Sequence, residues 1–270
     1  MNLDKETHNP YTPPESSVND VVQPANNNET FIPGAQSVQA GEGVNWIGEA
    51  WQLIKPKLGM WVLLGVILFV IMLVVQLIPL VSLVSIFAGP IFIGGIMLLC
   101  EKQRTTGEFD LGLMFAGFQK NLGPLIGVGA VMFGILMLSL IVMFIVGGSA
   151  LVALALGSQG GDPSAALTGI SGGMVFLAFL LMFVIYMVGY ALTWFAPALI
   201  VIHNLSLGQA LSMSLSAVKK NLLPGLIYFI VIGVIMVISM IPLFLGLLLA
   251  GPLFIATYYT SYRSLFIANK

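Results

Sequence analysis

The sequence contains very little charge for its length. Asp, Glu, Lys and Arg make up 8% of its 270 residues, whereas an average soluble domain carries about 25%. The apolar types A, V, I, L, M, F, W, Y and C make up 58%, and the mean hydropathy is +1.01. A soluble domain could not cover its surface with so few charged side chains. The composition therefore excludes a water-soluble globular protein and predicts a protein embedded in a bilayer.

Residue types that support catalysis or metal binding are also scarce. The single cysteine, Cys100, excludes an intrachain disulfide. The two histidines, His8 and His203, belong to no HExxH or CxxC pattern, so we expect neither a metal site nor a cofactor. No glycine-rich phosphate loop follows a strand, and no basic and aromatic stretch indicates nucleic-acid binding. We interpret His203 as a polar end of a membrane helix.

Three carboxylates fall in one short segment with two bases. Glu101, Glu108 and Asp110 lie near Lys102 and Arg104. Paired carboxylates can serve acid–base catalysis, but we interpret this segment as a solvated loop followed by a helix start. The sequence thus predicts no catalytic residue, and we expect a protein that is not an enzyme.

Charge is missing altogether from four long stretches. They cover residues 58–100, 121–161, 163–202 and 221–262. A spanning helix needs about 20 apolar residues, so the first and last stretches each predict a hairpin of two spans, with turns at the prolines Pro79 and Pro242. The middle stretches predict one span each, joined by a glycine-rich segment over residues 149–173 that contains Asp162 and Pro163. The six predicted spans cover about 58–78, 81–100, 122–146, 174–202, 222–241 and 244–262.

All ten Lys and Arg residues fall on one side of this six-span arrangement, and the opposite side holds only Asp162. Cytoplasmic loops of membrane proteins carry an excess of such bases. We therefore expect both termini in the cytoplasm. The start of the chain has no basic segment followed by an apolar one, so we expect no cleavable signal peptide.

The first 45 residues differ from the rest. They are rich in Asn, Pro, Ser and Thr and hold six acids against one base, a composition typical of disorder. We therefore expect a disordered acidic tail over residues 1–45 and a membrane domain over 46–270. The stretch Asn9–Pro14 could present Tyr11 to a partner protein in an extended conformation; a solvated tail with incidental prolines is the alternative.

A threefold internal repeat organises the membrane domain. An amphipathic segment with apolar residues at i, i+3, i+4, i+7 and i+11 begins at Ile47, Leu111 and Leu211, with one polar departure at Ser214. Each segment ends in lysines and precedes a predicted hairpin. We expect these segments to lie at the cytoplasmic headgroups as amphipathic helices, with these residues as anchors: Trp51, Phe115 and Leu215.

The second span of each predicted pair contains a proline, and these residues are Pro90, Pro197 and Pro252. Proline inside a helix removes one hydrogen bond and usually kinks it. The predicted fold is therefore an all-α membrane protein with six transmembrane helices. They form three hairpin repeats, each preceded by a cytoplasmic interfacial amphipathic helix, and we expect approximate threefold symmetry about the membrane normal.

Several of these motifs resemble a known family. The segments are Gly43–Trp46, Leu77–Leu80, Leu113–Phe118 and Trp194–Leu199. They are similar to an uncharacterised family of six-helix proteobacterial inner-membrane proteins, over about residues 41–267. More distantly, the plan is similar to the membrane domain that precedes the catalytic domain in some glycerophosphodiester phosphodiesterases; that catalytic domain is absent here. The resemblance implies a bacterial inner-membrane location and brings no established activity.

Charge is also absent from the interior of the six predicted spans. Proton- and ion-coupled transporters usually place ionisable groups there. The weaker polar residues Tyr186, Tyr190 and Thr193 share one helical face and form a candidate polar seam. Interhelical hydrogen bonding and anchoring at the interface are the alternative roles for these three side chains.

These features leave two classes of function open. The first is a non-enzymatic scaffold or envelope and lipid-maintenance factor, whose partners are membrane lipids and a protein bound through the tail. The second is a transporter or lipid-handling protein that uses the kinked spans as a pathway. A polar cavity at mid-membrane would favour the second class, and a packed, dry core the first. Nothing in the sequence indicates nucleic-acid binding or an oligomeric state.

Overall fold

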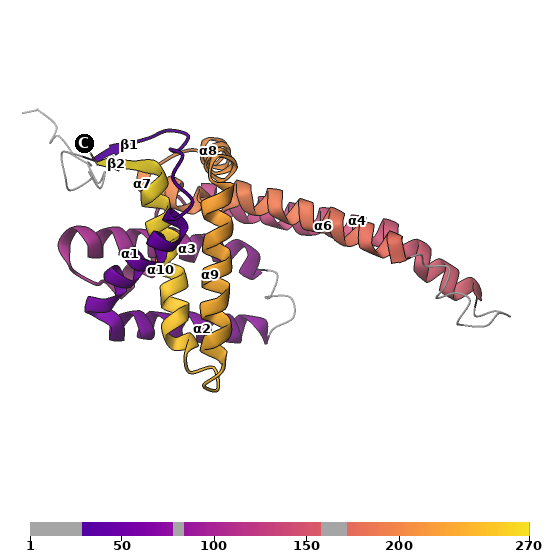
Figure 1. The fold of residues 1–270 in the computed structure, drawn as a ribbon, viewed down its shortest axis with the longest axis horizontal. Helices are drawn as coiled ribbons and strands as arrows, with labels where there is room; N and C mark the ends of the chain where they lie inside the picture. Colours follow the sequence, from indigo (N-terminus) through magenta and orange to yellow (C-terminus); the bar gives the residue numbers. More distant parts are fainter. Residues whose placement is uncertain (1–28, 78–83, 158–171, 270) are drawn as a thin grey trace, which may run out of the picture.

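The computed structural model describes residues 29–77, 84–157 and 172–269, and it is almost entirely helical (Figure 1). In chain order the elements are β1 (Glu29–Phe31), α1 (Glu42–Ile54), η1 (Lys55–Lys57), α2 (Leu58–Gln76), α3 (Val84–Thr106), η3 (Leu111–Phe118), α4 (Leu122–Gly157), α6 (Gly172–Thr193), α7 (Ala196–His203), α8 (Leu207–Lys220), α9 (Leu222–Met240), α10 (Leu247–Phe266) and β2 (Ile267–Asn269). The paired helices α4 and α6 extend away from a body formed by the other helices (Figure 1).

Five helical segments in the described residues are long and apolar enough to cross a membrane. They are Glu42–Gln76, Val84–Thr106, Leu122–Ile145, Phe176–His203 and Leu222–Met240. Large apolar side chains are exposed along them; Phe144, for example, is 77% exposed. Soluble proteins rarely expose large apolar patches. The chain is therefore a helical multi-pass membrane protein.

The sixth predicted span corresponds to α10, which is not among these five segments. The first half of α10 is apolar. Its second half contains a polar run from Thr257 to Arg263, and this run is buried within the protein except for a half-buried Arg263. The polar run lowers the mean hydropathy of the helix. These polar side chains are tolerated because they contact other protein groups instead of lipid.

The end of the third span differs from the expectation. The sequence predicted that the helix ends at Gly147 and Gly148, whereas α4 continues to Gly157. Residues 149–157 are mostly Ala and Leu, which are strong helix formers. A helix also satisfies its own backbone groups where water is scarce. The expected turn at Pro79 and the pair Asp162 and Pro163 lie outside the described residues.

The fourth span is broken beside Pro197. Helix α6 ends at Thr193 and α7 begins at Ala196, so Pro197 lies in the first turn of a new helix instead of kinking a continuous one. The other two expected kinks, Pro90 and Pro252, lie inside α3 and α10.

A serine from α8 completes this break. The Ser214 hydroxyl accepts a hydrogen bond from the Phe195 N–H (3.0 Å) and donates one to the Ala191 carbonyl (2.8 Å). In a continuous helix, the N–H of residue 195 would bond to the carbonyl of residue 191. Ser214 is thus inserted into the helical ladder. This role explains the one polar departure from the amphipathic repeat.

The three interfacial segments take different forms. Helix α1 packs on α10 and α9, and α8 packs on α6 and α7. The second segment is the 3-10 helix η3 instead of the expected α-helix, and it packs closely on α3. A Cβ added to Gly117 would lie 2.1 Å from the Ile91 carbonyl oxygen. A short glycine-containing 3-10 segment therefore allows a backbone approach that a regular helix with larger side chains would prevent.

The expected anchors lie on these segments. Trp51 is 40% exposed, Phe115 is 44% exposed and Leu215 is partly buried. The large aromatic residue that α1 buries is the neighbouring Trp46.

The expectation of a disordered tail up to residue 45 is wrong for residues 29–45. Strand β1 pairs antiparallel with β2, and the Ile32 and Gln36 N–H groups donate to the Phe266 and Leu265 carbonyls. Helix α1 begins at Glu42. The binding of this segment depends on backbone groups and charge, which a search for periodic apolar residues does not detect. Residues 1–28, including Tyr11, lie outside the described residues.

We predict that Ser214→Ala destabilises the protein by about 1–3 kcal/mol, because two buried backbone groups lose their partner. The measurement is denaturant or thermal unfolding of the purified protein in detergent. Ser212→Ala is the matched control, because Ser212 is exposed on the same helix. Equal stability of the two variants would show that the break does not depend on the inserted hydroxyl.

Candidate functional site

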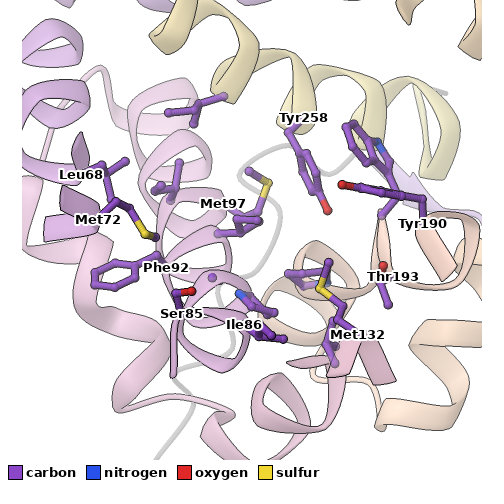
Figure 2. A pocket seen from close by; sticks show the side chains of 18 of the residues that line it. Leu68, Met72, Ser85, Ile86, Phe92, Met97, Met132, Tyr190, Thr193 and Tyr258 are labelled. Carbon is purple, nitrogen blue, oxygen red and sulfur yellow. The ribbon is translucent and has the colours of Figure 1, made fainter. Parts of the chain in front are cut away.

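The candidate site is a cavity of about 590 Å³ in the helical body (Figure 2). This volume lies within the range of about 300–1,000 Å³ that is typical of small-molecule sites. The helices that contain Pro90, Pro197 and Pro252 (α3, α7 and α10) all contribute to its lining, together with α2, α4 and α6. The lining residues are Leu68, Met72, Ser85, Ile86, Gly89, Pro90, Phe92, Ile93, Ile96, Met97, Val128, Met132, Leu136, Tyr186, Tyr190, Thr193, Trp194, Pro197, Phe254, Ile255 and Tyr258.

Two of the proline helices shape the cavity through their backbones. Pro90 lies within α3, and the adjacent Gly89 leaves open space where a Cβ would lie. On the other side, Pro197 opens α7 just after the break held by Ser214. The cavity therefore lies beside a glycine in α3 and beside the break between α6 and α7.

The predicted seam residues Tyr186, Tyr190 and Thr193 all line this cavity. Figure 2 shows Tyr190, Thr193 and Tyr258 on one side, with Leu68 and Met72 on the opposite side. The seam therefore forms one edge of a mostly apolar space.

The hydroxyl of Thr193 is already satisfied within its own helix. It donates to the Gly189 carbonyl at 2.9 Å, the local bond that serine and threonine often make in membrane helices. The hydroxyl of Tyr190 belongs to a side chain that is 48% exposed. Tyr190 thus supplies a polar group at the rim of the cavity.

The remaining lining is mostly apolar and adaptable, with Ser85 and Tyr258 as its further hydroxyl-bearing residues. Met72, Met97 and Met132 have flexible side chains that fill irregular spaces and tolerate ligands of varied shape. The lining includes no charged residue. Among the described residues, no cluster of three or more His, Cys, Asp or Glu side chains could hold a metal. Such a cavity is suited to a flexible, apolar ligand with a weakly polar end.

A second cluster, which the sequence did not reveal, lies where α3 and α10 end. Glu29 of β1 bonds to Arg104 (3.1 Å) and to Arg263 (2.8 Å). Arg104 also bonds to Glu101 (2.6 Å) and to the Tyr259 hydroxyl (3.0 Å). Tyr259 in turn donates to Glu101. We call these five residues the arginine cluster.

Glu101 therefore does not lie in a solvated loop, contrary to the expectation. Its side chain and that of Glu29 are each only 7% exposed. The other two acids of that segment, Glu108 and Asp110, are more exposed and pair with Lys102. The polar run in the sixth predicted span was the one available sign of buried polar contacts.

His203 is a further neighbour of the N-terminal segment. Its ring stacks on Phe31 with a centroid distance of 3.8 Å and its Nε2 bonds to the Tyr262 hydroxyl. The expected polar helix end is thus covered by β1.

Searches of protein-family models, of curated proteins and of solved structures give no match to this chain. The resemblance to six-helix proteobacterial inner-membrane proteins therefore remains a prediction from the sequence motifs.

The pH dependence of β1 binding follows from Glu29. Hydrogen bonds from Arg263, together with the charge of both arginines, hold the pKa of this carboxyl below its ordinary value of 4.5, although burial opposes the shift. The stabilisation is thus fully present above pH 4.5 and is lost as the pH falls through the lowered pKa.

We predict that Glu29→Gln lowers stability by about 1 kcal/mol at pH 7, because a charge-assisted bond becomes a neutral one. The difference from the wild type should shrink as the pH falls below 4.5, where the wild-type carboxyl also loses its charge. Unfolding temperatures of both proteins in detergent between pH 7 and pH 3 measure this. A difference that stays constant with pH would contradict the role of the Glu29 charge.

Proposed function

We propose that the protein is a non-enzymatic inner-membrane protein that binds membrane lipid and serves envelope or lipid maintenance. The observation that supports this best is the cavity among the proline helices, which is apolar, adaptable and free of charged lining residues. An acyl chain is the ligand that matches this lining, and the weakly polar rim at Tyr190 suits an ester group.

The position of the cavity supports a lipid as ligand. Its lining belongs mainly to helices long and apolar enough to span the bilayer. Large apolar side chains are exposed on these helices, for example Phe69 and Phe176. Lipid is therefore the most abundant molecule around the cavity, whereas a polar solute would find no charged group there.

The alternative function is a lipid-handling transporter that uses the same cavity. The observation that favours it is the break between Thr193 and Ala196 beside the cavity, because broken helices line the substrate sites of many transporters. Reconstitution separates the two functions. Faster exchange of a fluorescent lipid between the leaflets of liposomes would indicate transport, and an unchanged exchange rate would indicate binding alone.

The proposal includes six spans in three parallel units, with both termini in the cytoplasm. Two features support the units. The first feature is the start of the first span of each unit, which is α2, α4 and α9 in turn. Each of these helices begins on a leucine, and the residue before that leucine lies outside the α-helical backbone region; the preceding residues are Lys57, Asn121 and Asn221. The second feature is the packing of the interfacial segments.

The packing of these segments follows a cyclic order. The segment of the first unit, α1, packs on α10 of the third unit; η3 of the second unit packs on α3 of the first; and α8 of the third packs on α6 and α7 of the second. Each segment thus covers the proline helix of the preceding unit. A cyclic exchange of this kind is what approximate threefold symmetry requires.

We predict that a reporter active only in the periplasm is silent when fused after Lys270 and active when inserted near Gly160. The reason is that all Lys and Arg residues fall on one side of the six-span arrangement. Reporter activity in cells expressing each fusion measures this. Activity of the C-terminal fusion, or silence of the Gly160 insertion, would contradict the topology.

We predict that Gly89→Leu reduces lipid retention several-fold, because its side chain would occupy the open space beside Pro90. Native mass spectrometry of the purified protein measures the bound lipid. Gly251→Leu is the matched control: Gly251 also precedes a helical proline and has open space for a Cβ, but it does not line the cavity. Equal lipid retention by the two variants would contradict binding in this cavity.

A further inference from the structure

The arginine cluster offers a second site, independent of the lipid cavity. The guanidinium groups of Arg104 and Arg263 converge on the one carboxylate of Glu29. Planar arginine forks match phosphate as well as carboxylate geometry. Glu29 thus occupies a position in which a phosphate oxygen could accept the same hydrogen bonds.

The space next to the cluster is not filled. A cleft of about 460 Å³ is lined by both arginines and by Lys57, Tyr259 and Thr260, with Glu49 as its one acidic lining residue. If Glu29 left, three bases would face Glu49 and the adjacent Glu101, so the site would carry a net positive charge. The cleft gives room for a group attached to a phosphate.

A turn divides strand β1 from the rest of the N-terminal segment. Gly34 and Ala35 follow it with φ angles of +84° and +62°, which is a turn. Beyond this turn, Asn221 holds Gln36 and Val38 through separate hydrogen bonds. Displacement of β1 therefore breaks its ladder with β2 and the contacts of Glu29 and Phe31, and leaves the part after the turn attached.

We infer that Arg104 and Arg263 form a binding site for a phosphate group, either of an anionic lipid or free in solution, and that Glu29 of β1 blocks this site until the phosphate displaces it. The bases of the chain gather at this end of the proposed topology, where cytoplasmic headgroups lie. The site would therefore couple phosphate binding to the release of β1.

The test uses the full-length protein in two settings. One is nanodiscs of phosphatidylcholine with or without phosphatidylglycerol, and the other is detergent with inorganic phosphate. Hydrogen exchange of the β1 amides reports displacement. Faster exchange in phosphatidylglycerol nanodiscs alone identifies a lipid headgroup, and faster exchange with inorganic phosphate identifies free phosphate. Unchanged exchange in both settings would overturn the inference.

Variants separate a specific site from general charge. In equilibrium dialysis against labelled phosphate, or in retention of phosphatidylglycerol, Glu29→Gln should bind about tenfold more tightly, because a charge-assisted competitor is weakened. Adding Arg263→Gln should abolish the gain. Glu108→Gln removes one exposed acid outside the cluster, so an equal gain in that variant would overturn the inference.

A second variant covers the case in which Glu29→Gln folds poorly. Phe31→Ala removes the stack on His203 and loosens β1 without changing any charge. It should also tighten phosphate binding, although by less. Unchanged binding in a folded Phe31→Ala protein would show that β1 does not block the site.

Discussion

The satisfaction of backbone hydrogen bonds where helices are interrupted is the constraint on which this structure depends. Inside a bilayer no water replaces a missing partner, so each break needs a protein group. Ser214 supplies it at the break between α6 and α7 by bonding to both Phe195 and Ala191. At the end of α8, the Asn221 side-chain amide donates to the Ala217 carbonyl and also to the Gln36 carbonyl of the N-terminal segment. Small polar side chains thus determine where the helices can bend.

Because these groups come from neighbouring elements, each break also connects two parts of the chain. Ser214 lies on α8 and completes a break in the preceding pair of spans. Asn121, which precedes α4, donates to the Ile200 carbonyl of α7 at 2.8 Å. The interfacial segments are therefore part of the body. This explains why their buried faces contact protein while Trp51 and Phe115 are exposed.

Much of the membrane body could be predicted from the sequence, because apolar length and proline position are local signals. Helical spacing puts the seam residues, for example Tyr190, on one helical face, and all three line the same cavity. The arginine cluster could not be found this way, because Glu29 and Arg263 are distant in sequence and pair only through tertiary structure. The burial of Glu101 could not be predicted for the same reason. A charged residue near the end of a span is expected to be solvated, and its partners Arg104 and Tyr259 are known only from the structure.

Helix α10 shows how one element serves both sites. Its consecutive residues Tyr258 and Tyr259 point about 100° apart, as the helical period requires. Tyr258 faces the apolar cavity, whereas Tyr259 bonds to Arg104 and Glu101. The polar run that lowers the hydropathy of α10 is thus the part that joins the two sites. A rotation of α10 about its axis would therefore change the cavity wall and the arginine cluster together, whereas a substitution at Tyr258 or at Tyr259 would alter one of them.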